Sequence, residues 1–152
     1  MMKGLRRAHA DEAAKIAAFQ RAAYDRNRAI LGVEPIPLKA DYAKILDQYE
    51  VWLNEDDDRL AGVLILEPRS DDLLIWSVAT APDARGSGVG NRLLAAADTR
   101  ARELGKHVMR LYTGELLVDN VAWYRRRGYA IERTEAMSDR KIVHMKKTVK
   151  GE

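Results

Sequence analysis

The stretch ARGSGVGNRLLAAA, residues 84–97, constrains the fold more than any other part of the chain. Three glycines, Gly86, Gly88 and Gly90, stand at alternate positions, and helix-forming residues follow at once. Glycine costs backbone entropy, so one explanation is only a flexible loop that happens to precede a helix. The chemical explanation is that glycines leave the amides unobstructed where a helix start supplies unpaired N–H groups, as a bound phosphate requires.

The length and composition of the chain indicate one globular domain. With 152 residues it is long enough to bury a core and short for two typical domains. It has no cysteine, which excludes disulfides, thiolate metal sites and a cysteine nucleophile. No stretch approaches the roughly 20 apolar residues of a membrane span, and the N-terminus lacks the apolar region of a secretory signal. We therefore expect a single domain over 1–152, with a core of about 3–148, a cytoplasmic location and no membrane partner.

The charged residues do not indicate a nucleic-acid or metal site. The net charge is only +3, acidic runs such as NEDDDR interrupt the basic ones, and no aromatic-interleaved basic stripe occurs. The histidines His9, His107 and His144 show no ligand spacing, and the acids at 56–58 belong to a predicted hairpin turn. We therefore expect no nucleic acid and no metal.

Periodicity and turn residues predict alternating strands and helices. The predicted helices are 11–30 with Asp11 as cap, 40–48, 90–105 closed by Gly105, and 119–129 capped by Asp119 or Asn120 and closed by Gly128. The predicted strands are 5–8, 49–54, 60–66, 70–80, 106–115 and two within 129–149. Residues 32–42 contain Pro35 and Pro37 and are predicted to be a loop. This order favours an α+β fold of three layers, in which helices flank a mixed, mostly antiparallel central sheet.

The glycine loop does not match the two best-known nucleotide motifs. A Walker loop needs Lys and Ser or Thr after its last glycine, where this chain has Asn91 and Arg92. A dinucleotide fingerprint needs the spacing G-x-G-x-x-G directly after a strand, and here the glycines are alternate and follow APDAR.

The pattern that fits is Arg/Gln-x-x-Gly-x-Gly/Ala between a strand and a helix, matched by Arg85, Gly88 and Gly90. Downstream, NVAWYRRRGY supplies an Asn, a Tyr in a short helix and a Gly-Tyr pair. With these two motifs in this order, the chain from about Lys3 to Thr148 resembles the GCN5-related N-acetyltransferase (GNAT) superfamily. The resemblance implies the acyl-CoA N-acyltransferase fold, acetyl-CoA as co-substrate, and direct attack by an amine in a ternary complex.

The resemblance and the physics of the loop together suggest how acetyl-CoA would be held. The loop amides would form a concave site for the pyrophosphate at a positive helix end, and the strand before the loop would offer backbone groups to the pantetheine arm. By resemblance, Asn120 contacts the cofactor arm and Tyr124 protonates the leaving sulfur, as a phenol with a reference pKa of about 10 can. The expected cofactor-binding residues are Val78, Ala79, Thr80, Arg85, Gly86, Ser87, Gly88, Val89, Gly90, Asn120 and Tyr124.

The general base is the point at which the chain departs from its relatives. Many have a carboxylate just before the Val-Ala pair, and this chain has Trp76 and Ser77 there. Glu67 and Glu115, each at the end of a predicted strand, are the substitute catalytic candidates beside Tyr124. A catalytic carboxylate would face the cleft with a raised pKa. The alternative is deprotonation of the amine by water.

The acceptor is expected to be a primary amine of a small molecule. The proline-bearing loop lies between the first two helices, which often cover the acceptor pocket in this superfamily, and Tyr42 or Trp76 would line an aromatic site or pack in the core. Two alternatives stay open: a non-catalytic acyl-CoA sensor, and an acetyltransferase acting on protein amines. Exposed sheet edges would allow a homodimer.

Overall fold

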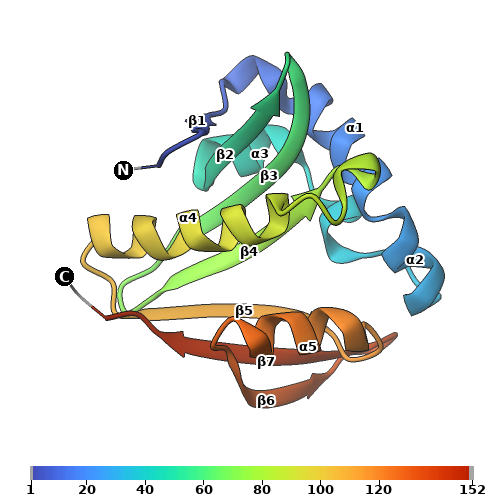
Figure 1. The fold of residues 1–152 in the computed structure, drawn as a ribbon. Coiled ribbons are helices and arrows are strands. Elements are labelled where there is room, and N and C mark those ends of the chain that lie inside the picture. Colours follow the sequence, from blue (N-terminus) through green and yellow to red (C-terminus); the bar gives the residue numbers. More distant parts are fainter. Residues whose placement is uncertain (1, 151–152) are drawn as a thin grey trace.

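The computed structural model describes residues 2–150 and shows one seven-stranded sheet with helices on both faces (Figure 1). The strands are β1 Leu5–Arg7, β2 Glu50–Asp56, β3 Arg59–Pro68, β4 Leu73–Thr80, β5 Val108–Gly114, β6 Ala130–Ala136 and β7 Lys141–Thr148. The α-helices are α1 Ala13–Ala23, α2 Asp25–Leu31, α3 Tyr42–Gln48, α4 Val89–Glu103 and α5 Val118–Arg126, with short 3-10 turns η1 Ala10–Glu12, η2 Ile36–Lys39 and η3 Pro82–Ala84. The strand order is β1-β2-β3-β4-β5-β7-β6, and only β4 and β5 pair in parallel. The predicted α+β fold with a mixed, mostly antiparallel sheet is confirmed.

Alternation along the central strands gives the sheet two apolar faces. Leu64, Leu66 and Ile75 face α4 and α5, while Val63 and Ile65 face α1 and α3. Helix α4 buries the stripe foreseen from its sequence, Leu93, Leu94, Ala97 and Ala101, against the first face. These two cores produce the three layers.

Strands β4 and β5 separate soon after they meet. They are hydrogen-bonded neighbours only where Leu73–Ile75 pair with Met109–Leu111. Beyond Ile75 they diverge, and the sheet opens between its two halves (Figure 1). A bulge at Trp76, which has no opposite partner on β3, accompanies the separation. The backbone edge of β4 that follows is therefore free of β5.

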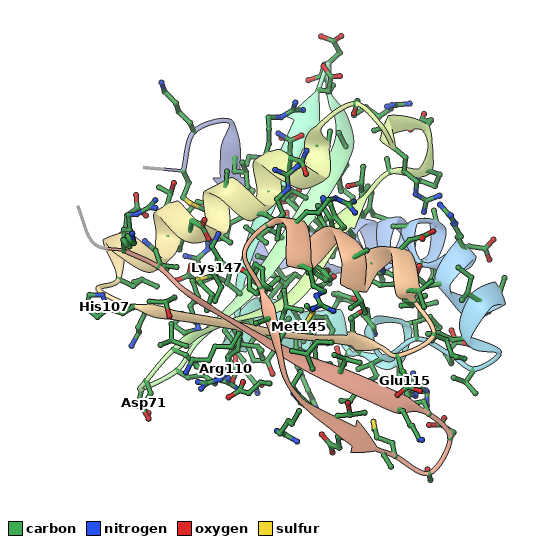
Figure 2. All side chains as sticks on the ribbon, turned by 60° about the horizontal axis from the view of Figure 1, so that its bottom comes forward. Asp71, His107, Arg110, Glu115, Met145 and Lys147 are labelled. Atoms are coloured by element: carbon green, nitrogen blue, oxygen red, sulfur yellow. The ribbon has the colours of Figure 1, made fainter. Side chains whose placement is uncertain are left out.

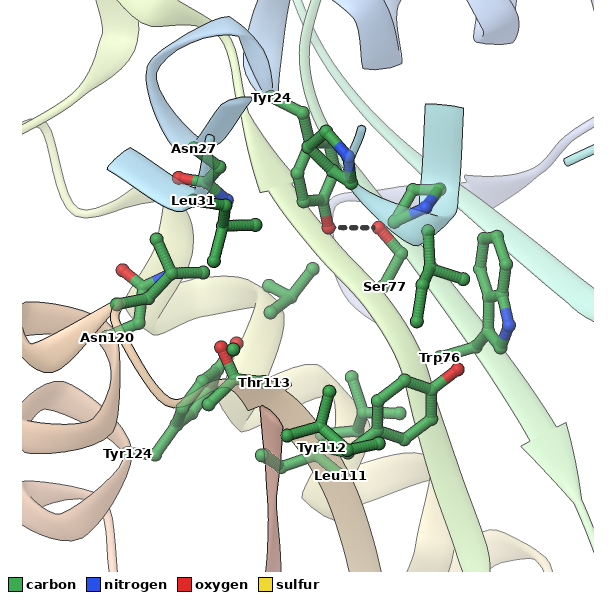
Figure 3. A pocket seen from close by; sticks show the side chains of 18 of the residues that line it. Tyr24, Asn27, Leu31, Trp76, Ser77, Leu111, Tyr112, Thr113, Asn120 and Tyr124 are labelled. Carbon is green, nitrogen blue, oxygen red and sulfur yellow. Dashed lines mark hydrogen bonds between the residues drawn. The ribbon is translucent and has the colours of Figure 1, made fainter. Parts of the chain in front are cut away.

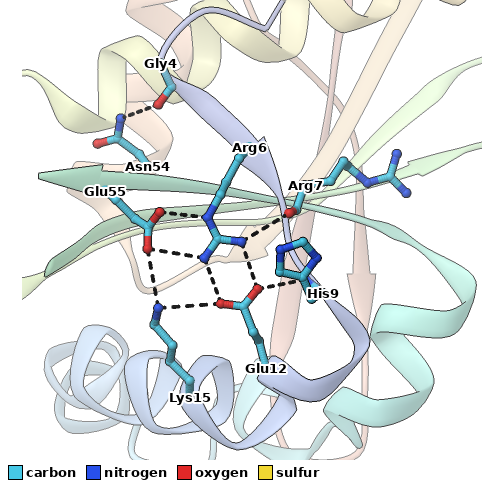
Figure 4. Close-up of polar contacts among 8 residues, drawn as sticks. All are labelled: Gly4, Arg6, Arg7, His9, Glu12, Lys15, Asn54 and Glu55. Carbon is cyan, nitrogen blue, oxygen red and sulfur yellow. Dashed lines mark hydrogen bonds and ion pairs between the residues drawn. The ribbon is translucent and has the colours of Figure 1, made fainter. Parts of the chain in front are cut away.

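Ion pairs hold the closed end of this opening. The carboxylate of Asp72, just before β4, is buried and accepts hydrogen bonds from Arg69 and from Arg110 of β5, each at 2.7 Å. Arg110 also donates to Glu132 of β6, and Figure 2 shows it among the strands of this end. A second network joins β1, α1 and β2, because Arg6 donates to both Glu12 and Glu55 and Lys15 pairs with both acids (Figure 4).

The first predicted helix, 11–30, is wrong in its continuity and its cap. It breaks at Tyr24 into α1 and α2, and it begins with the turn η1, whose N-cap is His9. Asp11 lies inside that turn, and Glu12 accepts the His9 backbone N–H at 2.8 Å. The loop with two prolines contains the turn η2, which Pro37 helps to start.

The start of α5 also differs from its prediction. Leu117 is the N-cap, so Asp119 and Asn120 lie in the first turn and neither caps it. This frees the Asn120 side chain for the cavity described below. The helix ends are as predicted, because Gly105 and Gly128 follow α4 and α5 with φ of +70° and +97°. Within residues 2–150, no helix is long and apolar enough to span a membrane.

Candidate active site

The glycine loop forms an open mouth at the start of α4. Gly86 and Gly88 have φ of +82° and +88°, which side-chain-bearing residues rarely adopt, and Gly88 is the N-cap of the helix. Arg85 and all three glycines line a cavity of about 380 Å³ there, together with Thr80, Ala84, Val89, Asn91 and Trp123. The first N–H groups of a 15-residue helix lie at this cavity, as an anion requires.

The need for a glycine at position 90 is explained by the close approach of the Trp123 indole. A Cβ at Gly90 would lie 3.1 Å from Cζ2 of Trp123, and the Trp123 Nε1–H donates to Asn91 Oδ1 at 2.8 Å. This contact joins α5 to the start of α4. Sequence reasoning missed Trp123, although it stands next to Tyr124 in the second motif.

Arg85 has a structural partner of its own. Its Nη2 donates to the carbonyl oxygen of Ala23, the last residue of α1, at 2.8 Å. The arginine therefore fixes the loop to the N-terminal layer while it lines the mouth. Ser87 does not line that cavity, since its hydroxyl donates to the Ala84 carbonyl oxygen.

A second cavity, of about 150 Å³, continues from the mouth toward the sheet opening. Thr80, Arg85 and Trp123 line both cavities. The second is completed by Ala23, Tyr24, Asn27, Val78, Ala79, Asn120 and Tyr124. The fold thus brings all but one of the predicted cofactor-binding residues to one continuous groove, the exception being Ser87.

Tyr124 lies on the path of the groove with an unengaged hydroxyl. Its side chain is buried, with the ring packed on Trp123 and Tyr129. Burial raises the pKa of Tyr124, and the nearby Tyr24 and Tyr129 add to the effect. Among residues 2–150, no hydrogen bond of this hydroxyl contributes to that pKa, and the side chain lines the second cavity. It therefore stays protonated at neutral pH and is free to donate that proton.

The groove ends in a third cavity, of about 90 Å³, on the α2 side of the opening (Figure 3). Val78, Asn120 and Tyr124 line it together with the second cavity. Trp76 does both things considered for it, since it lines this cavity and packs against the core under α1 and α3. Tyr42 does not line the cavity: its hydroxyl donates to the Pro37 carbonyl oxygen at 2.7 Å and its ring packs edge-on against Trp76.

Ser77, at the position where the resemblance led us to expect a carboxylate, belongs to a neutral hydrogen-bond network. Ser77 is buried, and its Oγ lies 2.8 Å from the Tyr24 hydroxyl (Figure 3) and 3.0 Å from Gln20 Nε2, which donates to it. Burial raises the pKa of Tyr24 to about 12, and the hydrogen bond to Ser77 opposes this rise. The network is therefore uncharged at neutral pH.

Neither predicted carboxylate lines the third cavity. Glu115 is exposed at the end of β5, and Figure 2 shows it at the end of the strand opposite to His107. Glu67 is half-buried at the end of β3. Glu67 affects Tyr112, which lines the cavity, through its charge. Burial raises the pKa of Tyr112, and Tyr49 and Glu67 raise it further. Residues 2–150 contain no group of three His, Asp or Glu side chains placed to hold a metal.

Comparison with known proteins agrees with this geometry. The model of the acetyltransferase (GNAT) family matches residues 14–129, more than half of the chain. No curated protein matches. The similar solved structures include a protein of Desulfovibrio desulfuricans assigned to the GNAT acetyltransferases, with 18% identity over 96% of this chain and 98% of the other and a TM-score of 0.78.

Two further similar structures contain the coenzyme. The PaiA N-acetyltransferase of Thermoplasma acidophilum, in complex with coenzyme A, has 15% identity over 95% of this chain and 97% of its own, with a TM-score of 0.78. YncA of Salmonella typhimurium, assigned to the acetyltransferases and solved with acetyl-CoA, has 20% identity over 97% of this chain and 94% of its own, with a TM-score of 0.71. At these identities the likeness concerns the fold. Together with the family match, it confirms the fold and enzyme class expected from the two motifs: the chain belongs to the acetyltransferase (GNAT) family.

Proposed function

We propose that this protein transfers the acetyl group of acetyl-CoA to the primary amine of a small molecule, within a single domain of residues 1–152. The observation that supports it is the continuous groove from the glycine mouth, past Tyr124, to the third cavity. An extended thioester and an amine entering from the other end would meet beside one phenol. Holding two reactants in this way supplies much of the rate of a bimolecular reaction.

The residues of the groove fit acetyl-CoA, which supplies an activated acetyl thioester when bound. The mouth of α4 offers amides and a positive helix end to the pyrophosphate, and the free edge of β4 from Val78 to Thr80 offers backbone groups to the amide-bearing arm. Asn120 would contact that arm from α5. Arg85 completes the wall of the mouth.

Tyr124 would supply the proton that the leaving thiolate needs. The hydroxyl hydrogen of Tyr124 would pass to the sulfur as the C–S bond breaks, and the proton that the amine releases to water would return to Tyr124, because burial raises its pKa and disfavours the phenolate. The amine loses its own proton to water, because the described lining of the third cavity contains no carboxylate. Glu67 or Glu115 would take part only by acting through an intervening water, because neither lines that cavity.

The test is acetyl-CoA-dependent CoA release with a panel of small amines and with lysine-bearing peptides. Release that depends on small amines supports the proposal. Release with peptides alone would replace it with a protein acetyltransferase, and tight acetyl-CoA binding without release by any amine would replace it with a sensor. Chromatography of the same preparation would report whether a homodimer forms.

A further inference from the structure

We propose that the acceptor is an amine that also carries a carboxylate, and that Arg140 in the third cavity binds this carboxylate. The inference rests on the proposed function and names its substrate class. It follows from the position of one buried guanidinium, from the hydrogen bonds that this group leaves unused, and from the lack of any other charged side chain among the described residues that line the cavity.

Arg140 lies on the acceptor side of the sheet. It precedes β7, in which Val143 packs in the core beneath α4 and α5 and Ile142 faces the opposite layer. Ile142 pairs with Gly114, and Leu31 of α2 closes over Gly114, with Cδ2 2.7 Å from the position of a Cβ there. The Arg140 side chain is only 6% exposed and lines the third cavity.

The guanidinium of Arg140 keeps part of its hydrogen-bonding capacity. Nε and Nη2 donate to the two carboxylate oxygens of Asp139, at 3.0 and 3.1 Å. In the described part of the chain, Nη1 has no hydrogen-bond partner. The Nη1–Nη2 end is therefore available, and an arginine fork binds a second carboxylate there through two parallel bonds.

Asp139 does not neutralise the positive charge that Arg140 presents to the cavity. Its side chain is 41% exposed, so solvent screens its charge, whereas Arg140 is almost covered. Arg140 holds the pKa of Asp139 below its usual range, and Lys39 of η2 adds to the effect. Asp139 thus stays ionised and orients the guanidinium from the solvent side.

The rest of the cavity favours a zwitterionic or anionic acceptor over a polycation. Arg140 is the only charged side chain among the described lining residues. A second ammonium group in the acceptor would face the guanidinium with no carboxylate among the described lining residues to compensate it, whereas a carboxylate in the acceptor would pair with the guanidinium. Leu31, Pro35, Ile36 and Pro37 add apolar lining to the same cavity, which suits a hydrocarbon side chain. The preferred acceptor class is an apolar amino acid or a close relative.

The experiment uses pairs of amines that differ in one carboxylate: L-leucine with 3-methylbutylamine, and L-phenylalanine with 2-phenylethylamine. Initial rates of CoA release are measured for the wild type, Arg140→Met, Arg140→Lys and Lys141→Met. Lys141 is the exposed neighbour, so its variant removes the same charge outside the cavity. For the amino acids, Arg140→Met should lower kcat/KM at least about tenfold, with partial recovery in Arg140→Lys. In Arg140→Met, kcat/KM for the decarboxylated amines and the KM for acetyl-CoA should change less than about twofold. In Lys141→Met, kcat/KM for the amino acids should also change less than about twofold.

Two results overturn the inference while leaving the proposed function intact: equal kcat/KM for the two members of each pair in the wild type, or equal losses for both members in Arg140→Met. If no amine releases CoA, the proposed function fails and calorimetric binding of L-leucine and L-phenylalanine to the CoA-loaded protein decides the site. Binding that is lost in Arg140→Met supports it. No binding, or binding that persists in that variant, overturns it.

Discussion

The hydroxyl of Tyr24 lies 2.8 Å from Oγ of Ser77, and this contact joins the break between α1 and α2 to the strand that borders the opening. The same Oγ accepts a hydrogen bond from Gln20, which is fully buried. Ser77 thus links α1 to β4.

Ser77→Ala should therefore destabilise the fold strongly. It would leave the Gln20 amide N–H buried without its acceptor, at a cost of about 2 kcal/mol in the free energy of unfolding. The measurement is urea unfolding of Ser77→Ala, Gln20→Met and the double variant. The double variant should lose clearly less than the sum of the two single losses. Thr99→Ala, which removes an exposed hydroxyl bond on α4, should cost under about 0.5 kcal/mol. If the loss in the double variant equalled the sum of the two single losses, the hydrogen bond between Gln20 and Ser77 would not contribute to stability.

Gly90→Asp should abolish acetyl-CoA binding. The new side chain displaces Trp123, which a Cβ would meet at 3.1 Å, and places a negative charge at the amides that would receive a pyrophosphate. We expect the dissociation constant for acetyl-CoA to rise at least about a hundredfold, as measured by calorimetry, with a native circular dichroism spectrum.

The matched control for Gly90→Asp is Gly105→Ala at the other end of α4. It strains a residue with φ of +70° in open space, so it should cost about 1 kcal/mol of stability and leave the affinity unchanged. Undiminished affinity in Gly90→Asp would refute the role of the loop. A similar loss in Gly105→Ala would attribute the effect to general destabilisation.

Local patterns in the sequence predicted most of the helices and strands. The turn residues and the alternation in 49–66 predicted the β2–β3 hairpin, and the stripe on α4 with Gly105 after it predicted that helix and its end. The two motifs predicted that Gly88 and Tyr124 contact the same co-substrate, and both residues line the groove.

Contacts between residues far apart in the chain could not be predicted from the sequence. Tyr24 interrupts a continuous helical pattern, and its partner Ser77 is 53 positions away. Arg140 stands in a polar turn whose composition indicates a solvated surface, and it lines the cavity because the strand that follows it pairs Ile142 with Gly114 of β5. Periodicity reports which face of an element is buried and does not report which element covers it.

The stability of the protein should fall in acid as Glu12 is protonated. Its hydrogen bond with Arg6, followed by the backbone N–H of His9, lowers the pKa of Glu12 to about 2 from the ordinary 4.5. A carboxylate with a lowered pKa stabilises the folded state above its unfolded pKa, and this contribution is lost as the pH falls from about 4.5 toward 2. With allowance for solvent screening, the contribution is about 1 kcal/mol. Unfolding of Glu12→Gln between pH 6 and about 2 should show a shallower slope than the wild type, and an equal slope would contradict the assignment.

Glu67→Gln and Glu115→Gln should leave the pH dependence of kcat/KM unchanged, because neither carboxylate lines the third cavity. The acidic limb would then belong to the amine and should move when an amine of lower pKa is used. If the limb disappears in Glu67→Gln, that glutamate is the base and acts through water near Tyr112. Glu115→Gln serves as the exposed comparison.

Replacing Tyr124 by Phe should lower kcat and spare the binding of acetyl-CoA. Removal of a positioned acid costs roughly a hundredfold in rate, whereas the ring that packs on Trp123 is retained. Because burial raises the pKa of Tyr124, the wild type should show no loss of rate from its ionisation up to about pH 10. Tyr129→Phe is the matched control, since that tyrosine is also buried and its hydroxyl has no partner in the described chain. If Tyr129→Phe lost as much activity as Tyr124→Phe, the loss would come from the shared aromatic packing, and the proton on the leaving sulfur would have to come from solvent.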